Sequence, residues 1–161
     1  MVNEQMGAVG VLLLAALCGL NPWVVLVIVV GLATHTRHAP LNQPFSELAN
    51  TLGIVVFAAI LGIEVVVSKL RRAARLVEPV SMAAAAFTGA LLPLALLAQD
   101  SQNAAWSVVP GLAIAVAFRY LRHRSANRLN KWLRPYGHVA AGIASDVLAG
   151  SFTAAVFAIK P

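Results

Sequence analysis

Charged side chains are scarce in this sequence. Only 11% of its 161 residues are Asp, Glu, Lys or Arg, whereas an ordinary soluble domain carries about 25%. Hydrophobic residues make up 60% of the chain, and the mean hydropathy is +0.80. Too few polar side chains remain to cover a surface that faces water, so lipid must solvate much of the protein.

Acidic residues and cysteine are rarer still. The chain has six Asp and Glu residues and a single cysteine, Cys18, which leaves no internal disulfide. The sequence has no glycine-rich phosphate loop, no His-Glu-x-x-His pattern and no cysteine pair. We therefore predict no catalytic residue, no metal and no cofactor, and the absence of these motifs argues against an enzyme.

Long apolar runs are what the sequence does have. Residues 7–33 carry no charge, and as one helix they would reach ~40 Å, more than the ~30 Å hydrocarbon core of a bilayer. Further apolar runs occupy residues 48–70, 80–98, 104–121 and 138–159. The sequence predicts an all-α, polytopic transmembrane helix bundle with four full spans and a broken first segment, in a single domain over residues 1–161.

The break in the first segment falls at Asn21-Pro22. Proline removes a helical N–H and clashes with the preceding turn, so each half is too short to span a bilayer alone. Two layouts remain open: one long kinked helix, or a re-entrant hairpin with both ends on one side. The break is either a simple proline kink or a discontinuous helix whose second N-terminus, at Pro22, points its partial positive charge at an anionic ligand, so Asn21 and Pro22 are candidate binding residues.

Positive charge is concentrated in two short stretches. Residues 69–78 and 119–134 hold ten of the twelve Lys and Arg, which predicts that both are cytoplasmic and that 34–47 and 99–103 face outward. This placement favours the anionic lipids of a bacterial inner membrane over nucleic acid, despite the net charge of +6. The candidate headgroup contacts are Lys69, Arg71, Arg72, Arg75, Arg119, Arg122 and Arg128.

Two acids, Glu64 and Asp146, lie well inside apolar runs. Their distances from the basic stretches put both ~9–12 Å below the cytoplasmic surface, so a shared site is conceivable. A charge at that depth marks function or a buried pair. Asp146 pairs with an arginine such as Arg119, caps a neighbouring helix, or binds a cation, a proton or a polar headgroup. Glu64 either pairs with Lys69 or Arg71 or joins that site.

Small residues surround Asp146 at helical spacing. They form two rows that permit close helix contact, so we expect Asp146 to face another helix rather than lipid. The rows are Gly142, Asp146, Gly150 and Ala154, and Ala141, Ser145 and Ala149.

Three segments resemble a small bacterial membrane family catalogued as domain of unknown function 4126. They read AALCGLNPWVVLVIVVGLATH, FAAILGIEVVVSKLRRAARLVEPVSMAAAAFTGALL and WSVVPGLAIAVAFRYLRHRSAN. The similar features are a Gly-Leu-x-x helix start, the late acid Glu64, the Glu78-Pro79 pair and Gly111. The resemblance implies an integral membrane protein and adds no catalytic residue.

A second likeness is local. SDVLAG at 145–150 is similar to the Asp-Asp-Val-x-Ala-Gly element of the phosphatidylglycerophosphatase A family, with Ser145 in place of the first acid. The further acidic motifs of that family are absent, and metal-assisted hydrolysis needs several carboxylates.

Three functions remain open on the sequence. The first moves an ion, a small solute or a lipid through the bundle, which would call for a homo-oligomer because the bundle is narrow. The second is a structural or accessory subunit that binds another membrane protein. The third, a lipid-phosphate enzyme, has the least support.

Overall fold

The computed structural model describes residues 8–35, 41–69, 74–97, 102–132 and 137–158. Within these ranges the chain forms six α-helices and one short 3-10 helix, with no strand. The all-α prediction is confirmed. The helices are α1 (Ala8–Leu20), α2 (Pro22–His35), α3 (Thr51–Lys69), α4 (Ala74–Leu96), α5 (Gln102–Trp132) and α6 (Gly137–Ala158), and the 3-10 helix is Phe45–Leu48.

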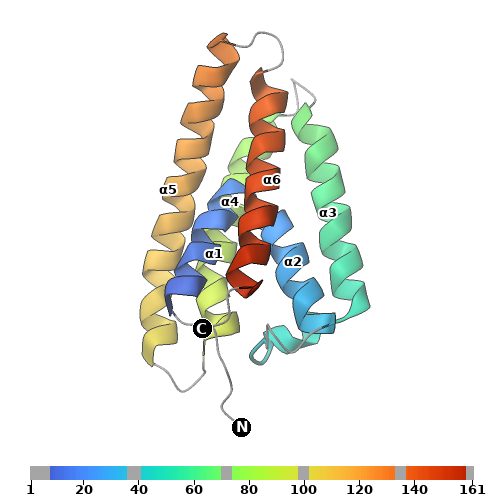
Figure 1. The fold of residues 1–161 in the computed structure, drawn as a ribbon, viewed down its shortest axis with the longest axis vertical. Coiled ribbons are helices and arrows are strands. Elements are labelled where there is room, and N and C mark those ends of the chain that lie inside the picture. Colours follow the sequence, from blue (N-terminus) through green and yellow to red (C-terminus); the bar gives the residue numbers. More distant parts are fainter. Residues whose placement is uncertain (1–7, 36–40, 70–73, 98–101, 133–136, 159–161) are drawn as a thin grey trace.

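The first apolar segment is two helices, as its sequence predicts. α1 ends at Leu20 and α2 begins at Pro22, with Asn21 alone between them. Of the two layouts, the structure has the hairpin: α1 rises from the lower end of the bundle in Figure 1 and α2 returns to that end.

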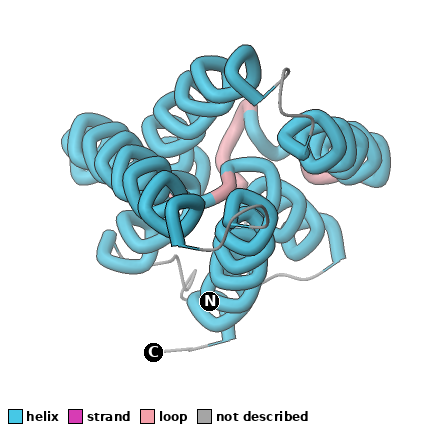
Figure 2. The backbone as a smooth tube through the Cα atoms, turned by 90° about the horizontal axis from the view of Figure 1, so that it is seen from above, coloured by secondary structure: helices cyan, strands magenta, loops and turns pink. Residues whose placement is uncertain are grey.

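The hairpin lies inside a bundle of the other four helices. α1 packs against α4, α5 and α6, and α2 packs against α3 and α6, an arrangement that Figure 2 shows from above. The buried core joins α1 residues such as Val11 and Leu14 to Val25 and Val29 of α2 and Leu92 of α4. The hairpin tip is therefore surrounded by helices.

Two helices extend further than the sequence predicts. α4 begins at Ala74, before the Glu78-Pro79 pair, and α5 continues to Trp132 through the basic stretch expected after residue 121. Residues 122–132 contain no glycine or proline, and Arg, Ala, Leu and Lys are good helix formers, so nothing ends α5 earlier.

α4 and α5 approach closely because glycine lies at their contact. A Cβ on Gly89 would come 2.5 Å from Ala115 Cβ and 2.8 Å from the Gly111 carbonyl oxygen. A Cβ on Gly19 of α1 would likewise meet the Ala115 carbonyl oxygen at 2.4 Å. Small residues at three helices therefore set the spacing around α5.

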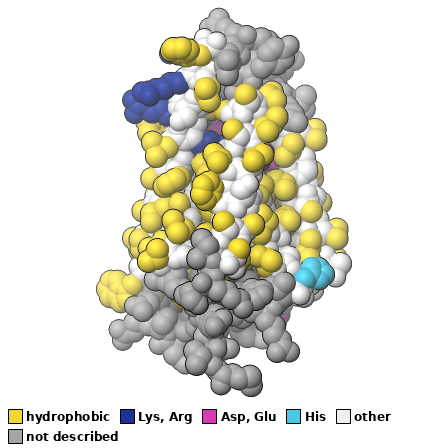
Figure 3. Space-filling model, in the orientation of Figure 1, with side chains coloured by type: hydrophobic (Ala, Val, Ile, Leu, Met, Phe, Trp, Pro, Cys, Tyr) yellow, Lys and Arg dark blue, Asp and Glu magenta, His cyan; other side chains and the backbone are white. Residues whose placement is uncertain are grey.

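The outer surface of the bundle is largely apolar. Figure 3 shows hydrophobic side chains over most of the bundle's length, with basic side chains at one end. Among the described residues, two helices are long and apolar enough to cross a membrane, Glu78–Leu96 and Val139–Ala158, and α3 has a shorter apolar stretch, Thr51–Val67. The all-helical architecture is therefore confirmed, whereas the prediction of four full spans is not confirmed.

The close contact at Gly89 gives a stability test. The added methyl group of Gly89→Ala would push α4 away from Ala115 and the Gly111 carbonyl of α5. We therefore expect the free energy of unfolding to fall by ~1–3 kcal/mol, the usual cost of overpacking. Gly142 has no atom within 4 Å of an added Cβ, so Gly142→Ala should be neutral or stabilise by up to ~1 kcal/mol through helix propensity. Thermal unfolding in detergent measures both, and equal midpoint shifts would contradict this packing.

Candidate functional site

The break at Asn21 leaves helical backbone groups without their usual partners. Pro22 has no N–H to donate, and the first N–H groups of any helix lack intrahelical acceptors. The side chain of Asn21 replaces those acceptors: its Oδ1 accepts hydrogen bonds from the Trp23 N–H at 3.0 Å and the Val24 N–H at 3.3 Å. Asn21 is therefore the N-cap of α2.

The carbonyl end of α1 is satisfied by two arginines of α5. Nη1 of Arg119 donates to the Leu20 carbonyl oxygen at 3.4 Å, and Nη1 of Arg122 donates to the same oxygen at 2.5 Å. A helix C-terminus carries partial negative charge, so the two guanidinium groups complement it.

The second polar atom of the Asn21 side chain, Nδ2, contacts Asp146 of α6. Nδ2 of Asn21 donates to Asp146 Oδ1 at 2.8 Å. Because Asn21 is only 2% exposed, this contact lies inside the bundle. Asp146 therefore pairs with an amide, and among the described residues it forms no ion pair with the arginine that one of the alternatives above expected.

The small-residue rows of α6 face the bundle over part of their length. Ser145 and Ala149 are buried, and a Cβ on Gly150 would touch Val24 and Ile28 of α2 at ordinary contact distances. Gly142, in contrast, faces open space. Gly150 therefore lies against α2, whereas Gly142 has no close neighbour.

Glu64 of α3 is held by α4. Ser81 Oγ donates to Glu64 Oε1 at 2.6 Å, and Ser81 Oγ in turn accepts from Nη2 of Arg119 at 2.5 Å. The same arginine nitrogen lies 4.0 Å from Glu64 Oε1. The second oxygen of Glu64, Oε2, is buried and makes no hydrogen bond to the described residues.

Arg119 also connects this interior to the surface of the bundle. Its Nε lies 3.6 Å from Glu78 Oε1, and Nδ1 of His123 lies 3.4 Å from the same oxygen. Arg119 is 4% exposed, whereas the side chains of Glu78 and His123 are 40% and 51% exposed. A continuous series of polar contacts therefore runs from His123 to Glu64.

These groups form one set of charges, which we name the hairpin-tip cluster. Three carboxylates face two guanidinium groups in it, so one negative charge is in excess when His123 is neutral. Figure 3 shows basic and acidic atoms recessed between apolar ridges in the upper half of the view. The members are Asn21, Glu64, Glu78, Ser81, Arg119, Arg122, His123 and Asp146, together with the Leu20 carbonyl oxygen.

The structure brings the four candidate binding residues to this region. Asn21 and the buried Pro22 form the tip, Asp146 reaches it through Asn21, and Glu64 reaches it through Ser81 and Arg119.

The candidate headgroup contacts separate into three groups. Arg119 and Arg122 both donate to the Leu20 carbonyl oxygen; Arg119 is buried and Arg122 is partly exposed, and whether either contacts a headgroup stays a prediction. Arg128 is exposed on α5. The side chains of Lys69, Arg71, Arg72 and Arg75 lie outside the described residues.

Sequence reasoning missed Ser81, Glu78 and His123 as members of the cluster. Ser81 follows Glu78 by three positions, and His123 follows Arg119 by four. Residues at these spacings share a helix face, so each pair offered a local signal. Which faces meet depends on helix packing, which the local pattern does not contain.

The contact between Asn21 and Asp146 can be tested by exchange. Asn21→Asp keeps an oxygen for the α2 cap but replaces the donating amide with a second carboxylate, so we expect a loss of ~1–3 kcal/mol. Adding Asp146→Asn restores one donor and one acceptor and should recover much of that loss. Thermal unfolding of the two single variants and the double variant checks this, and strictly additive effects would contradict the contact.

Comparison with known proteins identifies the family and nothing finer. Neither a curated protein nor a solved structure matches the chain. The family profile described as Domain of unknown function (DUF4126) matches residues 8–160, which is most of the chain. The protein therefore belongs to the DUF4126 family.

Proposed function

We propose that this protein is a small polytopic membrane protein that moves an ion, a small solute or a lipid across the bilayer, with the hairpin-tip cluster as its site. The observation that carries the proposal is the meeting of Glu64, Asp146 and Arg119 at the backbone break of a helical hairpin. Discontinuous helices with charged partners at mid-membrane are the substrate and ion sites of many transporters.

Membrane insertion is the first step of this proposal. Two helices have the length and hydropathy of spans, and large apolar side chains such as Val109, Phe87 and Ile63 are exposed on the outside of the bundle. We infer that α3 and α5 also cross, and that the hairpin re-enters from the side where α1 begins. The basic end of the bundle then lies on the cytoplasmic side of a bacterial inner membrane.

The charges of the cluster favour a cation, with a proton as the simplest case. A charge inside a bilayer is costly, by roughly 2.5–3.5 kcal/mol on insertion scales, and a buried ion pair seldom stabilises a fold more than apolar packing does. The excess negative charge would be neutralised by a bound cation or by protonation. Glu64 Oε2 has no hydrogen-bond partner among the described residues. It is therefore the atom best suited to bind the cation or the proton.

An accessory or structural subunit is the second candidate. Gly62 of α3 faces open space, and exposed Ala58 precedes it by four residues, with Val55 and Val66 exposed on the same helix. Small residues four apart are a common interface between membrane helices. Purification as a stable homo-oligomer without another protein would weigh against this candidate and would agree with a transporter built from several copies.

Proton flux into liposomes tests the transport proposal. Glu64→Gln and Asp146→Asn remove the two part-buried charges at nearly constant volume, and we expect each to reduce flux at least tenfold. Glu47→Gln is the matched control, because Glu47 is exposed in the 3-10 helix at the other end of the bundle. An internal pH dye reports the rate under an imposed potential. Flux that survives both cluster variants unchanged would refute the assignment of this site.

The orientation can be tested by labelling introduced cysteines in intact cells. Glu47→Cys should react with a membrane-impermeant maleimide from outside, whereas Asn127→Cys should react only after permeabilisation. The native Cys18 is fully buried and should contribute little background. Labelling of Asn127→Cys in sealed cells, with Glu47→Cys protected, would reverse the proposed topology.

A further inference from the structure

We propose that the exposed basic face at the end of α5 is a binding site for the phosphate of an anionic phospholipid headgroup. This inference rests on the proposed membrane location but not on transport. The face, which we name the α5 basic face, bounds an open hollow of about 280 Å³ and consists of Tyr120, His123, Arg124, Asn127, Arg128 and Lys131.

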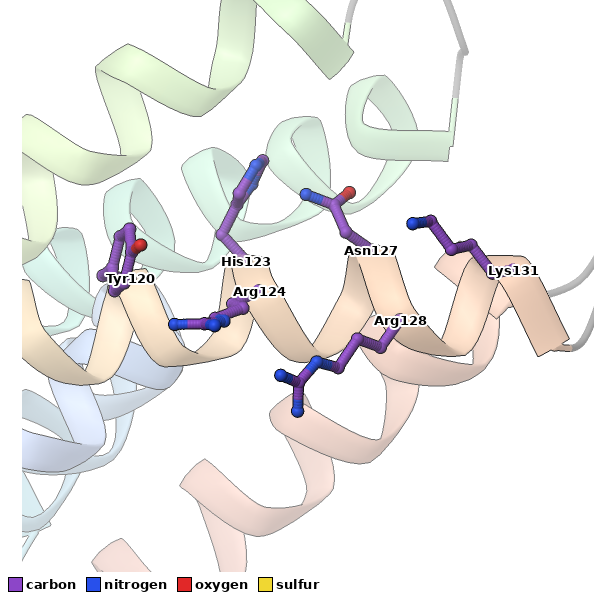
Figure 4. Close-up of a pocket in the computed structure, with 6 residues that line it drawn as sticks. All are labelled: Tyr120, His123, Arg124, Asn127, Arg128 and Lys131. Carbon is purple, nitrogen blue, oxygen red and sulfur yellow. The ribbon is translucent and has the colours of Figure 1, made fainter.

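The side chains of the α5 basic face lie on two neighbouring ridges of one helix. Figure 4 shows Tyr120, His123, Asn127 and Lys131 projecting from one side of α5, with Arg128 directed to another. Arg124 and Arg128 are four residues apart, and side chains at that spacing begin ~5–6 Å from each other. Two guanidinium groups so placed can contact one phosphate, a group that arginine binds with paired N–H donors.

The charge of this face is almost all of one sign. Residues 119–132 contain no Asp or Glu, and Glu78 on α4 is the acid found beside His123, at 3.4 Å. Among the described basic residues of this stretch, Arg119 and Arg122 are directed inward to the Leu20 carbonyl oxygen. Arg124, Arg128 and Lys131 remain exposed, so the face presents positive charge outward.

The depth of the face matches a lipid headgroup and argues for lipid over another polyanion. Trp106, near the opposite end of α5, is 79% exposed, and exposed tryptophan is typical of the membrane interface. At ~1.5 Å per residue, Arg124 and Arg128 lie about 27 and 33 Å along α5 from Trp106. These distances bracket the ~30 Å hydrocarbon core of a bilayer, so the two arginines fall at the headgroups of the opposite leaflet.

Apolar side chains of the same helix flank the arginines on both sides. Leu121 is exposed and lies on the acyl-chain side of Arg124, whereas the exposed Leu129 and Trp132 lie at or beyond the level of the headgroups. A basic helix with exposed aromatic and aliphatic residues at this level is suited to an anionic bilayer surface. Free phosphate or RNA would use the charges but not these apolar neighbours.

Lipid-dependent stability of the purified full-length protein tests the site. In detergent micelles, added phosphatidylglycerol should raise the midpoint of thermal unfolding by several degrees more than phosphatidylcholine does. The double variant Arg124→Gln, Arg128→Gln should lose most of that difference. The double variant Arg124→Lys, Arg128→Lys keeps the charge and should retain a large part of it.

A charge-matched control separates this face from net charge. The double variant Arg37→Gln, Lys160→Gln also removes two positive charges, at positions outside the described residues. It should keep the full difference between the phosphatidylglycerol and phosphatidylcholine shifts. Loss of the difference in this control, or its retention in the Arg124→Gln, Arg128→Gln variant, would overturn the proposal. An equal shift from inorganic phosphate or a short RNA would also overturn it, because the site would then not depend on lipid.

The result is distinguishable from the transport test. A lost lipid response with unchanged proton flux supports the headgroup site alone. Lost flux in the Glu64 and Asp146 variants with an intact lipid response leaves the headgroup site standing. Native mass spectrometry of co-purified phosphatidylglycerol supplies a second readout, in which the Arg124→Gln, Arg128→Gln variant should retain less lipid than the control.

Discussion

The fold depends on how the backbone groups freed at Asn21-Pro22 are satisfied. A broken helix deep in a bundle exposes N–H and carbonyl groups that water cannot reach, and each would be costly if left unpaired. Asn21 supplies the missing acceptor for α2, and Arg119 and Arg122 supply donors for the last carbonyl of α1. Without these partners, a hairpin tip enclosed by four helices would be unstable.

The same contacts explain why charges lie inside an apolar bundle. Arg119 is held at the tip by the Leu20 carbonyl oxygen, and a buried arginine in turn requires acids nearby. Glu64 and Glu78 meet that requirement on two sides, through Ser81 and by direct proximity. The contacts that satisfy the helix break therefore also gather a cluster of charged side chains inside the bundle, and this cluster is the basis of the cation site that we propose.

Local sequence predicted the elements better than their assembly. Proline at position 22 predicts the break, because it has no N–H, and the apolar runs predict where helices occur along the chain, although α4 begins earlier and α5 ends later than expected. The reversal of direction at Asn21 depends on arginines about a hundred positions later, so no local pattern contains it. For the same reason Arg119, first in a basic stretch, reads as a headgroup contact although the fold turns it inward. Asp146 and Glu64 could be identified from their isolation in apolar runs, whereas Ser81 is ordinary in sequence and acquires its role only by packing.

The most direct measurement is an experimental structure of the full-length protein in lipid nanodiscs, read at the hairpin tip. The account predicts that α1 and α2 enter and leave the bilayer on the same side. It also predicts that Arg119 and Arg122 converge on the Leu20 carbonyl oxygen and that Asn21 contacts Asp146 below the level of the headgroups. A continuous helix through residues 7–33 that crosses the bilayer, with both arginines directed into the headgroups, would contradict it.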